Sequence, residues 1–103
     1  MKNAVLDTSV LMEAKKGLTT IFSIVEYPKA LSYKSDVLWP EKEDFVSAVE
    51  IMAKLYAIGK PVPAIDVLIA AMCINRSMEL KTKDKHFSDV QSVESSLKVS
   101  FLK

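Results

Sequence analysis

A short apolar run that ends in an aspartate constrains the fold of this chain more than any other feature. Ala4, Val5 and Leu6 form the run, and Asp7 follows directly. A continuous apolar run of this kind predicts a strand buried on both faces, which is typical of a parallel sheet covered by helices. Because α/β proteins place ligand sites at the carboxyl ends of parallel strands, Asp7 is a candidate for such a site.

Helix-like patterns follow this first strand. Phe45, Val49, Met52 and Tyr56 are spaced by four, three and four residues, which predicts one apolar face of a helix that starts at the acidic 41–44 segment. Gly59 is expected to end it. Further helices are expected over 10–16, around Glu26, and over 64–76.

Strand-like patterns complete the expected fold. We predict further strands over 19–22, 79–82 and 97–102, whereas 32–40 has no clear periodicity. Pro28 predicts a kinked or late-starting helix around Glu26. The order of elements predicts an α/β fold with a central, mainly parallel sheet and helices on both faces. The length fits a single domain spanning residues 1–103.

Charge gives no global attraction for nucleic acid. Lys and Arg total 14 and Asp and Glu total 13, so the formal net charge is +1. Any RNA contact must therefore come from a local basic patch. Lys81, Lys83, Lys85 and His86 surround Asp84 in sequence and form such a candidate patch, although they also fit a solvated turn. His86 is expected to be a surface or packing residue rather than a general base.

Cysteine usage and hydropathy exclude several classes of protein. The single cysteine, Cys73, lies in an apolar run and is expected to be a small buried hydrophobe. One cysteine cannot form an internal disulfide, and no Cys/His cluster has zinc-site spacing. Asp7 interrupts the first apolar run, so no signal peptide is predicted, and the run 67–74 is too short to span a bilayer. We expect a cytoplasmic protein with no membrane partner.

The placement of the acidic residues points to a metal site. Asp7 ends an apolar strand, and Asp66 begins an otherwise apolar helix. Buried carboxylates are costly unless they are paired, neutralised or bound to a metal. Glu26 and Asp84 each follow a predicted strand, so four acids are expected to converge on one sheet edge, where oxygen ligands favour Mg²⁺ or Mn²⁺. Other acids lie in polar stretches or on helix faces expected to be solvated: Glu41, Glu43, Asp44, Glu50 and Glu94.

Each of the four acids also has a purely structural interpretation. Asp7 could cap the helix that follows it, and Ser23-x-x-Glu26 matches a capping box. Asp66 could suit the dipole of its helix. Asp84, between two lysines, could be a solvated turn residue. The convergence of all four on one sheet edge favours a site.

Two motifs resemble those of PIN domains. Asp7-Thr8-Ser9-Val10-Leu11 after a short strand resembles the family's opening motif. The stretch 59–87 (GKPVPAIDVLIAAMCINRSMELKTKDKHF) resembles its second half, in which an aspartate starts a small-residue helix and a Thr-x-Asp-x-x-Phe segment follows a strand. Glu26 falls where the family's glutamate is expected. The resemblance covers nearly the whole chain.

The resemblance implies a three-layer α/β/α sandwich and Mg²⁺- or Mn²⁺-dependent cleavage of RNA phosphodiester bonds. Many compact members are VapC-type toxins of type II toxin–antitoxin pairs, so an antitoxin partner and a homodimer are also implied. The catalytic and metal-binding acids would be Asp7, Glu26, Asp66 and Asp84. Supporting or substrate-binding roles would fall to Thr8, Thr82, Lys83 and Lys85, with Asp89 as a further acid in the outer shell.

Two alternatives to the ribonuclease remain. The segment between Asp7 and Glu26 is shorter than is usual for a toxin of this kind, which favours a catalytically weakened PIN-like module that binds protein or RNA. A different Mg²⁺-dependent α/β enzyme, such as a phosphatase, would also hold an aspartate after the first strand. Against it, the only glycines are Gly17 and Gly59, so there is no Gly-rich phosphate loop, and there is no Asp-x-Asp pair at the first strand.

Overall fold

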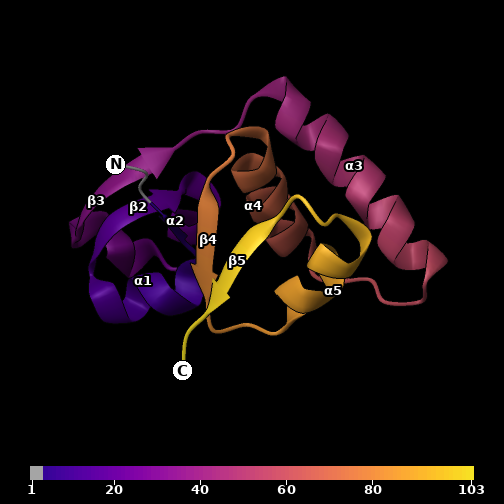
Figure 1. Ribbon diagram of the computed structural model, residues 1–103. Helices are drawn as coiled ribbons and strands as arrows, with labels where there is room; N and C mark the ends of the chain where they lie inside the picture. The colour runs from indigo at the N-terminus through magenta and orange to yellow at the C-terminus, as the bar shows by residue number, and fades with distance from the viewer. Residues whose placement is uncertain (1–3) are drawn as a thin grey trace.

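The computed structural model describes residues 4–103 (Figure 1). Its elements are β1 (Val5–Leu6), α1 (Thr8–Ala14), β2 (Lys16–Thr20), α2 (Ile21–Glu26), the 3₁₀ helix η1 (Pro28–Ser32), β3 (Lys34–Leu38), α3 (Lys42–Ala57), α4 (Ala64–Asn75), β4 (Glu79–Thr82), α5 (His86–Val93) and β5 (Lys98–Phe101). Within this part of the chain, no helix combines the length and apolar character needed to cross a membrane.

The five strands form one sheet in the order β3-β2-β1-β4-β5, and every neighbouring pair is parallel. β1 is short but central, since it pairs with β2 on one side and β4 on the other. Parallel strands end at the same edge of a sheet, so the residues just after β1 and β4 lie close together. The expected parallel sheet is confirmed.

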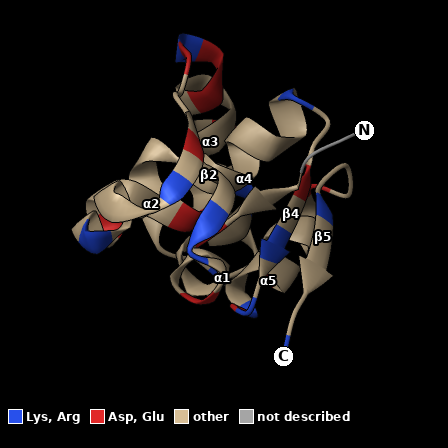
Figure 2. Ribbon diagram, turned by 90° about the vertical axis from the view of Figure 1, so that its left-hand side faces the viewer, with Lys and Arg blue, Asp and Glu red and all other residues tan. Residues whose placement is uncertain are grey.

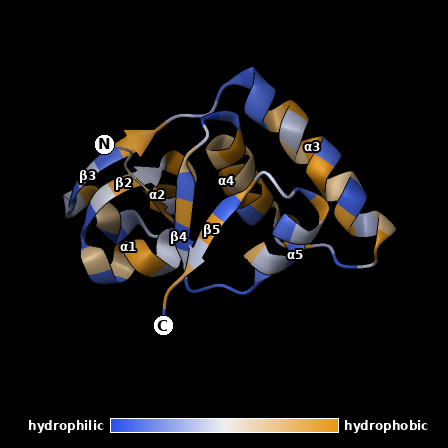
Figure 3. Cartoon of the chain, viewed as in Figure 1, coloured by the Kyte–Doolittle hydropathy of each residue, from blue (hydrophilic) through white to orange (hydrophobic). Residues whose placement is uncertain are grey.

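Helices cover both faces of this sheet, which confirms the expected three-layer α/β/α architecture (Figure 1). On one face, α3, α4 and α5 enclose a core that includes Leu55, Ile69 and Phe87. On the other face, α1 and α2 pack over a smaller core around Leu11 and Ile24. In Figure 3, α3 alternates between hydrophobic and hydrophilic residues. Its buried face consists of Asp44, Ala48, Ile51 and Leu55, whereas the predicted apolar residues Phe45, Val49 and Tyr56 are exposed.

The buried helix α4 contains the single cysteine. Cys73 is fully buried, as predicted, and burial raises the pKa of its thiol to about 12. The thiol therefore stays protonated at neutral pH and acts as a small apolar side chain.

The second strand and helix start earlier than predicted. β2 spans Lys16–Thr20 rather than 19–22, and α2 begins at Ile21. The Thr20 hydroxyl accepts a hydrogen bond from the Ser23 amide (3.3 Å) and so caps α2. The Ser23 capping-box interpretation of Glu26 is therefore wrong, because Glu26 is the last residue of α2. Although Ile21 and Phe22 favour strands, both pack against the cores, and tertiary packing overrides local preference.

Helix α1 also differs from its predicted range of 10–16. It spans Thr8–Ala14 because Asp7 caps it, and it ends at Lys15, which adopts a left-handed conformation (φ 58°). Gly17 lies in β2 with φ 114° rather than ending the helix. A Cβ there would lie 3.0 Å from Leu6 Cδ1, so glycine lets β2 approach β1 closely.

Two elements have no counterpart in the predicted pattern. The edge strand β3 falls in the 32–40 segment that has no clear periodicity, because all of its residues are exposed or only half buried. Helix α5 is largely polar and buries only Phe87 and Val90, which is too little to give an apolar periodicity. Pro28 opens η1 after α2 has already ended, so it neither kinks nor delays that helix.

Asp44 lies in the core rather than on a solvated face, contrary to the sequence-based expectation. It is 1% exposed. Arg76 binds it with two nitrogens, both at 3.0 Å, Asn75 donates at 2.9 Å, and the Glu41 amide donates at 2.7 Å. Burial raises the pKa of Asp44, but these hydrogen bonds and the Arg76 charge outweigh burial and hold it below its usual value. The cluster joins the start of α3 to the end of α4.

Replacing Arg76 with methionine should lower the free energy of unfolding by about 3 kcal/mol, because Asp44 then keeps a buried charge without its cation. Urea denaturation at pH 7 measures this loss. Lys54→Met is a matched control that breaks an exposed ion pair with Glu94 and should cost less than about 1 kcal/mol. An equal loss in both variants would contradict the role of Arg76.

Acid should reduce the difference in free energy of unfolding between the wild type and Arg76→Met. The pKa of Asp44 is lowered in the folded protein, so its stabilisation is present above the unfolded pKa of about 3.9. This stabilisation is lost as the pH falls through the folded pKa. Urea denaturation repeated between pH 7 and pH 2 checks the direction.

Candidate metal centre

Asp7 joins the carboxyl ends of the two central strands. It is 5% exposed, and its Oδ1 accepts hydrogen bonds from the Val10 amide (3.2 Å) and the Ser9 hydroxyl (2.6 Å). Its Oδ2 accepts a hydrogen bond from the buried Thr82 hydroxyl at the end of β4. The predicted helix cap is therefore confirmed, and the same carboxylate also reaches across to β4.

The residues after β4 complete this junction. The Thr82 hydroxyl, besides donating to Asp7, accepts a hydrogen bond from the Asp84 amide (2.9 Å). Ser9 in turn accepts a hydrogen bond from the Lys83 amide (3.1 Å). Thr82 therefore contacts the backbone of Asp84 as well as the side chain of Asp7, and its supporting role in catalysis stays a prediction.

Asp84 and His86 form the mouth of the site. Asp84 Oδ1 accepts a hydrogen bond from the His86 amide (2.9 Å) and lies 3.2 Å from His86 Nδ1. His86 Nδ1 also lies 3.4 Å from Asp66 Oδ2. One ligand atom from each of these three residues lies within 4.8 Å of the others. The sequence placed His86 in a candidate basic patch and predicted a surface or packing role rather than that of a general base, so it was not among the predicted metal ligands.

Asp66 is a buried acid among other acids. It lies in the first turn of α4, and its side chain is 13% exposed. Burial and the negative charges of Asp84 and Glu26 raise the pKa of Asp66 to about 6, although His86 opposes this rise. Whereas Asp44 is satisfied by Arg76, Asp66 faces an excess of negative charge.

Glu26 reaches the site from the opposite side. It is exposed at the end of α2, and its Oε1 accepts a hydrogen bond from the Thr8 hydroxyl (2.6 Å). Because Thr8 begins α1 directly after Asp7, this bond ties α2 to the same strand end. Thr8 therefore holds Glu26, as a supporting hydroxyl would.

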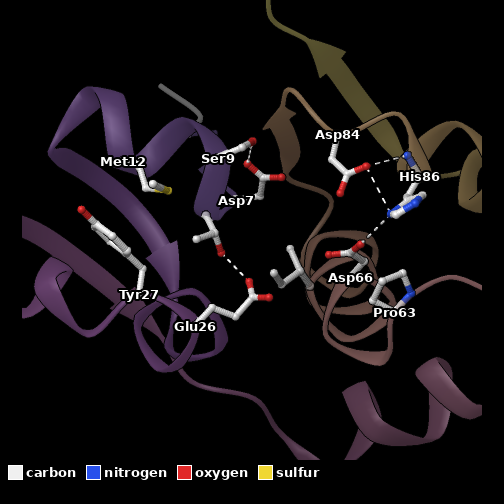
Figure 4. Close-up of a pocket in the computed structure, with 11 residues that line it drawn as sticks. Asp7, Ser9, Met12, Glu26, Tyr27, Pro63, Asp66, Asp84 and His86 are labelled. Atoms are coloured by element: carbon white, nitrogen blue, oxygen red, sulfur yellow. Dashed lines mark hydrogen bonds and ion pairs between the residues drawn. The ribbon is translucent and has the colours of Figure 1, made fainter.

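The four predicted acids line one cavity of about 400 Å³ (Figure 4). Glu26 lies in α2 and Asp66 in α4, whereas Asp7 and Asp84 lie in the loops after β1 and β4. Asp66, Asp84 and His86 lie together on one side of the cavity, with Glu26 across from them. Met12 and Tyr27 form an apolar wall on the Glu26 side. The remaining lining residues are Thr8, Ser9, Pro63 and Ile69.

The other predicted residues lie outside the lining of this cavity. The Lys83 side chain forms an ion pair with Glu13 of α1, and Lys85 is exposed at the start of α5. Asp89 lies 3.9 Å from Lys60. Basic and acidic residues are interspersed over the ribbon in Figure 2 rather than separated into one basic face. Roles for Lys83, Lys85 and Asp89 stay predictions.

The donor set fits a hard divalent cation. Carboxylates from Asp7, Glu26, Asp66 and Asp84 line a solvent-open cavity, and carboxylate oxygens are the ligands that Mg²⁺ and Mn²⁺ prefer. Of these acids, Asp66 and Asp84 have ligand atoms within 4.8 Å of one another and of a His86 nitrogen. Burial, followed by the negative charges of Asp84 and Glu26, raises the pKa of Asp66, so the protein disfavours the charged form of this carboxylate when no cation is bound. A bound cation would stabilise that charged form.

Replacing Asp66 with asparagine should stabilise the metal-free protein at pH 7 by up to about 3 kcal/mol, since a pKa raised by roughly two units corresponds to that free energy. The pKa of Asp66 is raised in the fold, so its charge destabilises the folded state above the unfolded pKa of about 3.9. The gain should therefore vanish as the pH falls to about 4. Urea denaturation in the presence of EDTA measures the change in free energy of unfolding. Asp36→Asn, at an exposed position, is the matched control. A loss of stability at pH 7 would contradict the charge excess.

Comparison with known proteins identifies the fold. No family model and no curated protein sequence matches the chain. The solved structures that it resembles include DNA-bound VapBC from Salmonella typhimurium, with TM-score 0.80, 15% identity and 98% of both chains covered. VapBC-1 from nontypeable Haemophilus influenzae has TM-score 0.76 and 16% identity, covering 95% of this chain and 96% of that one.

VapBC-5 from Mycobacterium tuberculosis, a member of the VapBC family of toxin–antitoxin systems, is a third such structure. It has TM-score 0.74 and 20% identity, and 96% of this chain and 98% of that chain are covered. At these identities the likeness establishes architecture, and it extends over nearly the whole length. The chain therefore has the PIN-like α/β/α fold found in VapBC toxin–antitoxin structures.

Proposed function

We propose that this protein is a Mg²⁺- or Mn²⁺-dependent endoribonuclease that acts as the toxin of a toxin–antitoxin pair. One observation carries the proposal: Asp7, Glu26, Asp66 and Asp84, far apart in sequence, line one cavity at the carboxyl edge of a parallel sheet. Burial raises the pKa of Asp66, and the negative charges of Asp84 and Glu26 raise it further, so a cation shared by these acids would be favourable there.

Asp66 and Asp84 are the proposed principal metal ligands. Asp66 is held by the first turn of a buried helix, and Asp84 by the Thr82 hydroxyl and the His86 amide, so both are positioned by the fold before anything binds. Asp7 has hydrogen bonds on both oxygens, so we assign it to positioning and to contacts through water. A divalent ion there supplies positive charge opposite the phosphate and promotes ionisation of the attacking water.

Glu26 is the proposed group that orients the attacking water. Thr8 holds one of its oxygens, and the side chain is exposed to the cavity opposite Asp66 and Asp84. A phosphodiester placed between the two sides would have acids on both sides of the phosphorus. The apolar wall of Met12 and Tyr27 would contact the adjacent ribose or base.

A catalytically weakened binding module is less well supported. The chain is short between Asp7 and Glu26, but that shortening does not remove an acid from the cavity. The hydroxyls of Thr8, Ser9 and Thr82 all bond to these acids or to their backbone. A binding module would have no need for such an arrangement.

An antitoxin protein and a second copy of this chain are the proposed partners. The VapBC structures named above come from toxin–antitoxin systems, which supports the antitoxin. Outward-facing apolar residues on α3, namely Val46, Val49 and Tyr56, are between 51% and 70% exposed and offer a contact surface for a homodimer.

Asp84→Asn should lower the rate of Mn²⁺-dependent RNA cleavage by roughly 100-fold or more, because it removes a charged ligand without changing size. The assay measures cleavage of a fluorescent RNA by the purified protein. EDTA should abolish cleavage, and Mn²⁺ added back in excess should restore it. Asp36→Asn on β3 is the matched control and should cleave like the wild type. Equal rates for the wild type and Asp84→Asn would reject the nuclease.

Val49→Glu should convert the homodimer to a monomer, because it puts a charge into an apolar contact. Light scattering coupled to size exclusion measures the mass. Glu50→Gln, also exposed on α3, is the control and should leave the dimer intact. A wild type that is monomeric at all concentrations would exclude this interface.

A further inference from the structure

We propose that His86 is a ligand of the divalent ion, adding an imidazole nitrogen to the carboxylates of Asp66 and Asp84 and making the site prefer Mn²⁺ to Mg²⁺. The inference rests on the metal site of the proposed function and goes beyond it by naming a nitrogen ligand. Its basis is the placement of His86 Nδ1 between two carboxylates of the cavity (Figure 4).

The distances fit neighbouring positions around one ion. His86 Nδ1 lies 3.2 Å from Asp84 Oδ1 and 3.4 Å from Asp66 Oδ2. With metal–ligand bonds of roughly 2.1 Å, adjacent ligands of an octahedron lie roughly 3 Å apart. All three atoms fall within 4.8 Å of one another, so a single ion can contact them after small side-chain shifts.

The fold holds the imidazole at this place. His86 is the first residue of α5, and its amide donates to Asp84 Oδ1 (2.9 Å). Its neighbour Phe87 is fully buried in the main core and anchors the helix start. The ring itself is half exposed, with 52% of the side chain accessible, so water can reach the second ring nitrogen when Nδ1 binds a metal.

Ligand chemistry then sets the preference between ions. Imidazole suits transition metals, whereas Mg²⁺ prefers oxygen and retains its waters. A site with two carboxylates and one imidazole therefore gains affinity for Mn²⁺ that it does not gain for Mg²⁺. Without metal, the same contacts form a histidine–aspartate ion pair, which is the competing explanation of the geometry.

The chain has one histidine, which makes the test unambiguous. Mn²⁺ is added to protein purified without a histidine tag, and electron spin-echo envelope modulation is recorded for the wild type, His86→Gln and Asp84→Asn. We expect imidazole nitrogen modulation on Mn²⁺ in the wild type and none in His86→Gln. Calorimetry should show Mn²⁺ affinity falling roughly tenfold in His86→Gln, with Mg²⁺ affinity changed by less than roughly threefold. Metal-free melting curves verify that each variant is folded.

Two results would overturn the inference. One leaves the proposed carboxylate metal site intact, and the other overturns that site as well. If Mn²⁺ binds the wild type and is lost in Asp84→Asn, but no nitrogen modulation appears, His86 is only an ion-pair partner and the proposed carboxylate site stands. If Mn²⁺ does not bind the wild type at all, the inference fails together with the metal site of the proposed function.

Discussion

The hydrogen bond between the Thr82 hydroxyl and Asp7 is the contact on which the candidate site depends. β1 consists of Val5 and Leu6, and the Asp7 amide extends its pairing by donating to the Lys81 carbonyl of β4 (3.1 Å). The Asp7 side chain adds a hydrogen bond from the Val10 amide of α1 and one from the Thr82 hydroxyl at the end of β4. The Thr82 hydroxyl also accepts a hydrogen bond from the Asp84 amide, so one buried hydroxyl sets the spacing between Asp7 and Asp84.

Two aspartates illustrate how differently the fold treats buried charge. Asp44 is enclosed by Arg76, Asn75 and the Glu41 amide, and its pKa is lowered. Asp66 is largely removed from solvent and lies near Asp84 and Glu26, so its pKa is raised to about 6. The first arrangement stabilises the fold by joining α3 to α4. The second costs stability, and proteins retain such a cost at sites where a ligand offsets it.

Most of the architecture could be predicted from local patterns. The apolar run before Asp7 and the apolar character of α4 each identified a real element, because burial imposes those patterns. The four-three-four spacing also identified the helix α3, but its residues Phe45, Val49 and Tyr56 are exposed, and the buried face is offset from them. β3 and α5 escaped prediction because an edge strand and a mostly polar helix bury too few residues to leave a pattern. The limits of β2 and α2 were misjudged because Ile21 and Phe22 fit a strand locally but pack as a helix.

The features of the candidate site can likewise be separated into those that local sequence determined and those that tertiary contacts decided. The sequence by itself determined that Asp7, Glu26 and Asp84 follow predicted strands and that Asp66 begins an apolar helix. The two motifs that contain three of these acids indicated the PIN-like fold. Only the tertiary structure decided that Glu26 ends its helix instead of capping it, that Asp44 is buried, that Lys83 is paired with Glu13, and that His86 faces Asp66 and Asp84. These outcomes depend on contacts between segments distant in the chain, and periodicity records how much a residue is buried but not which partner it meets.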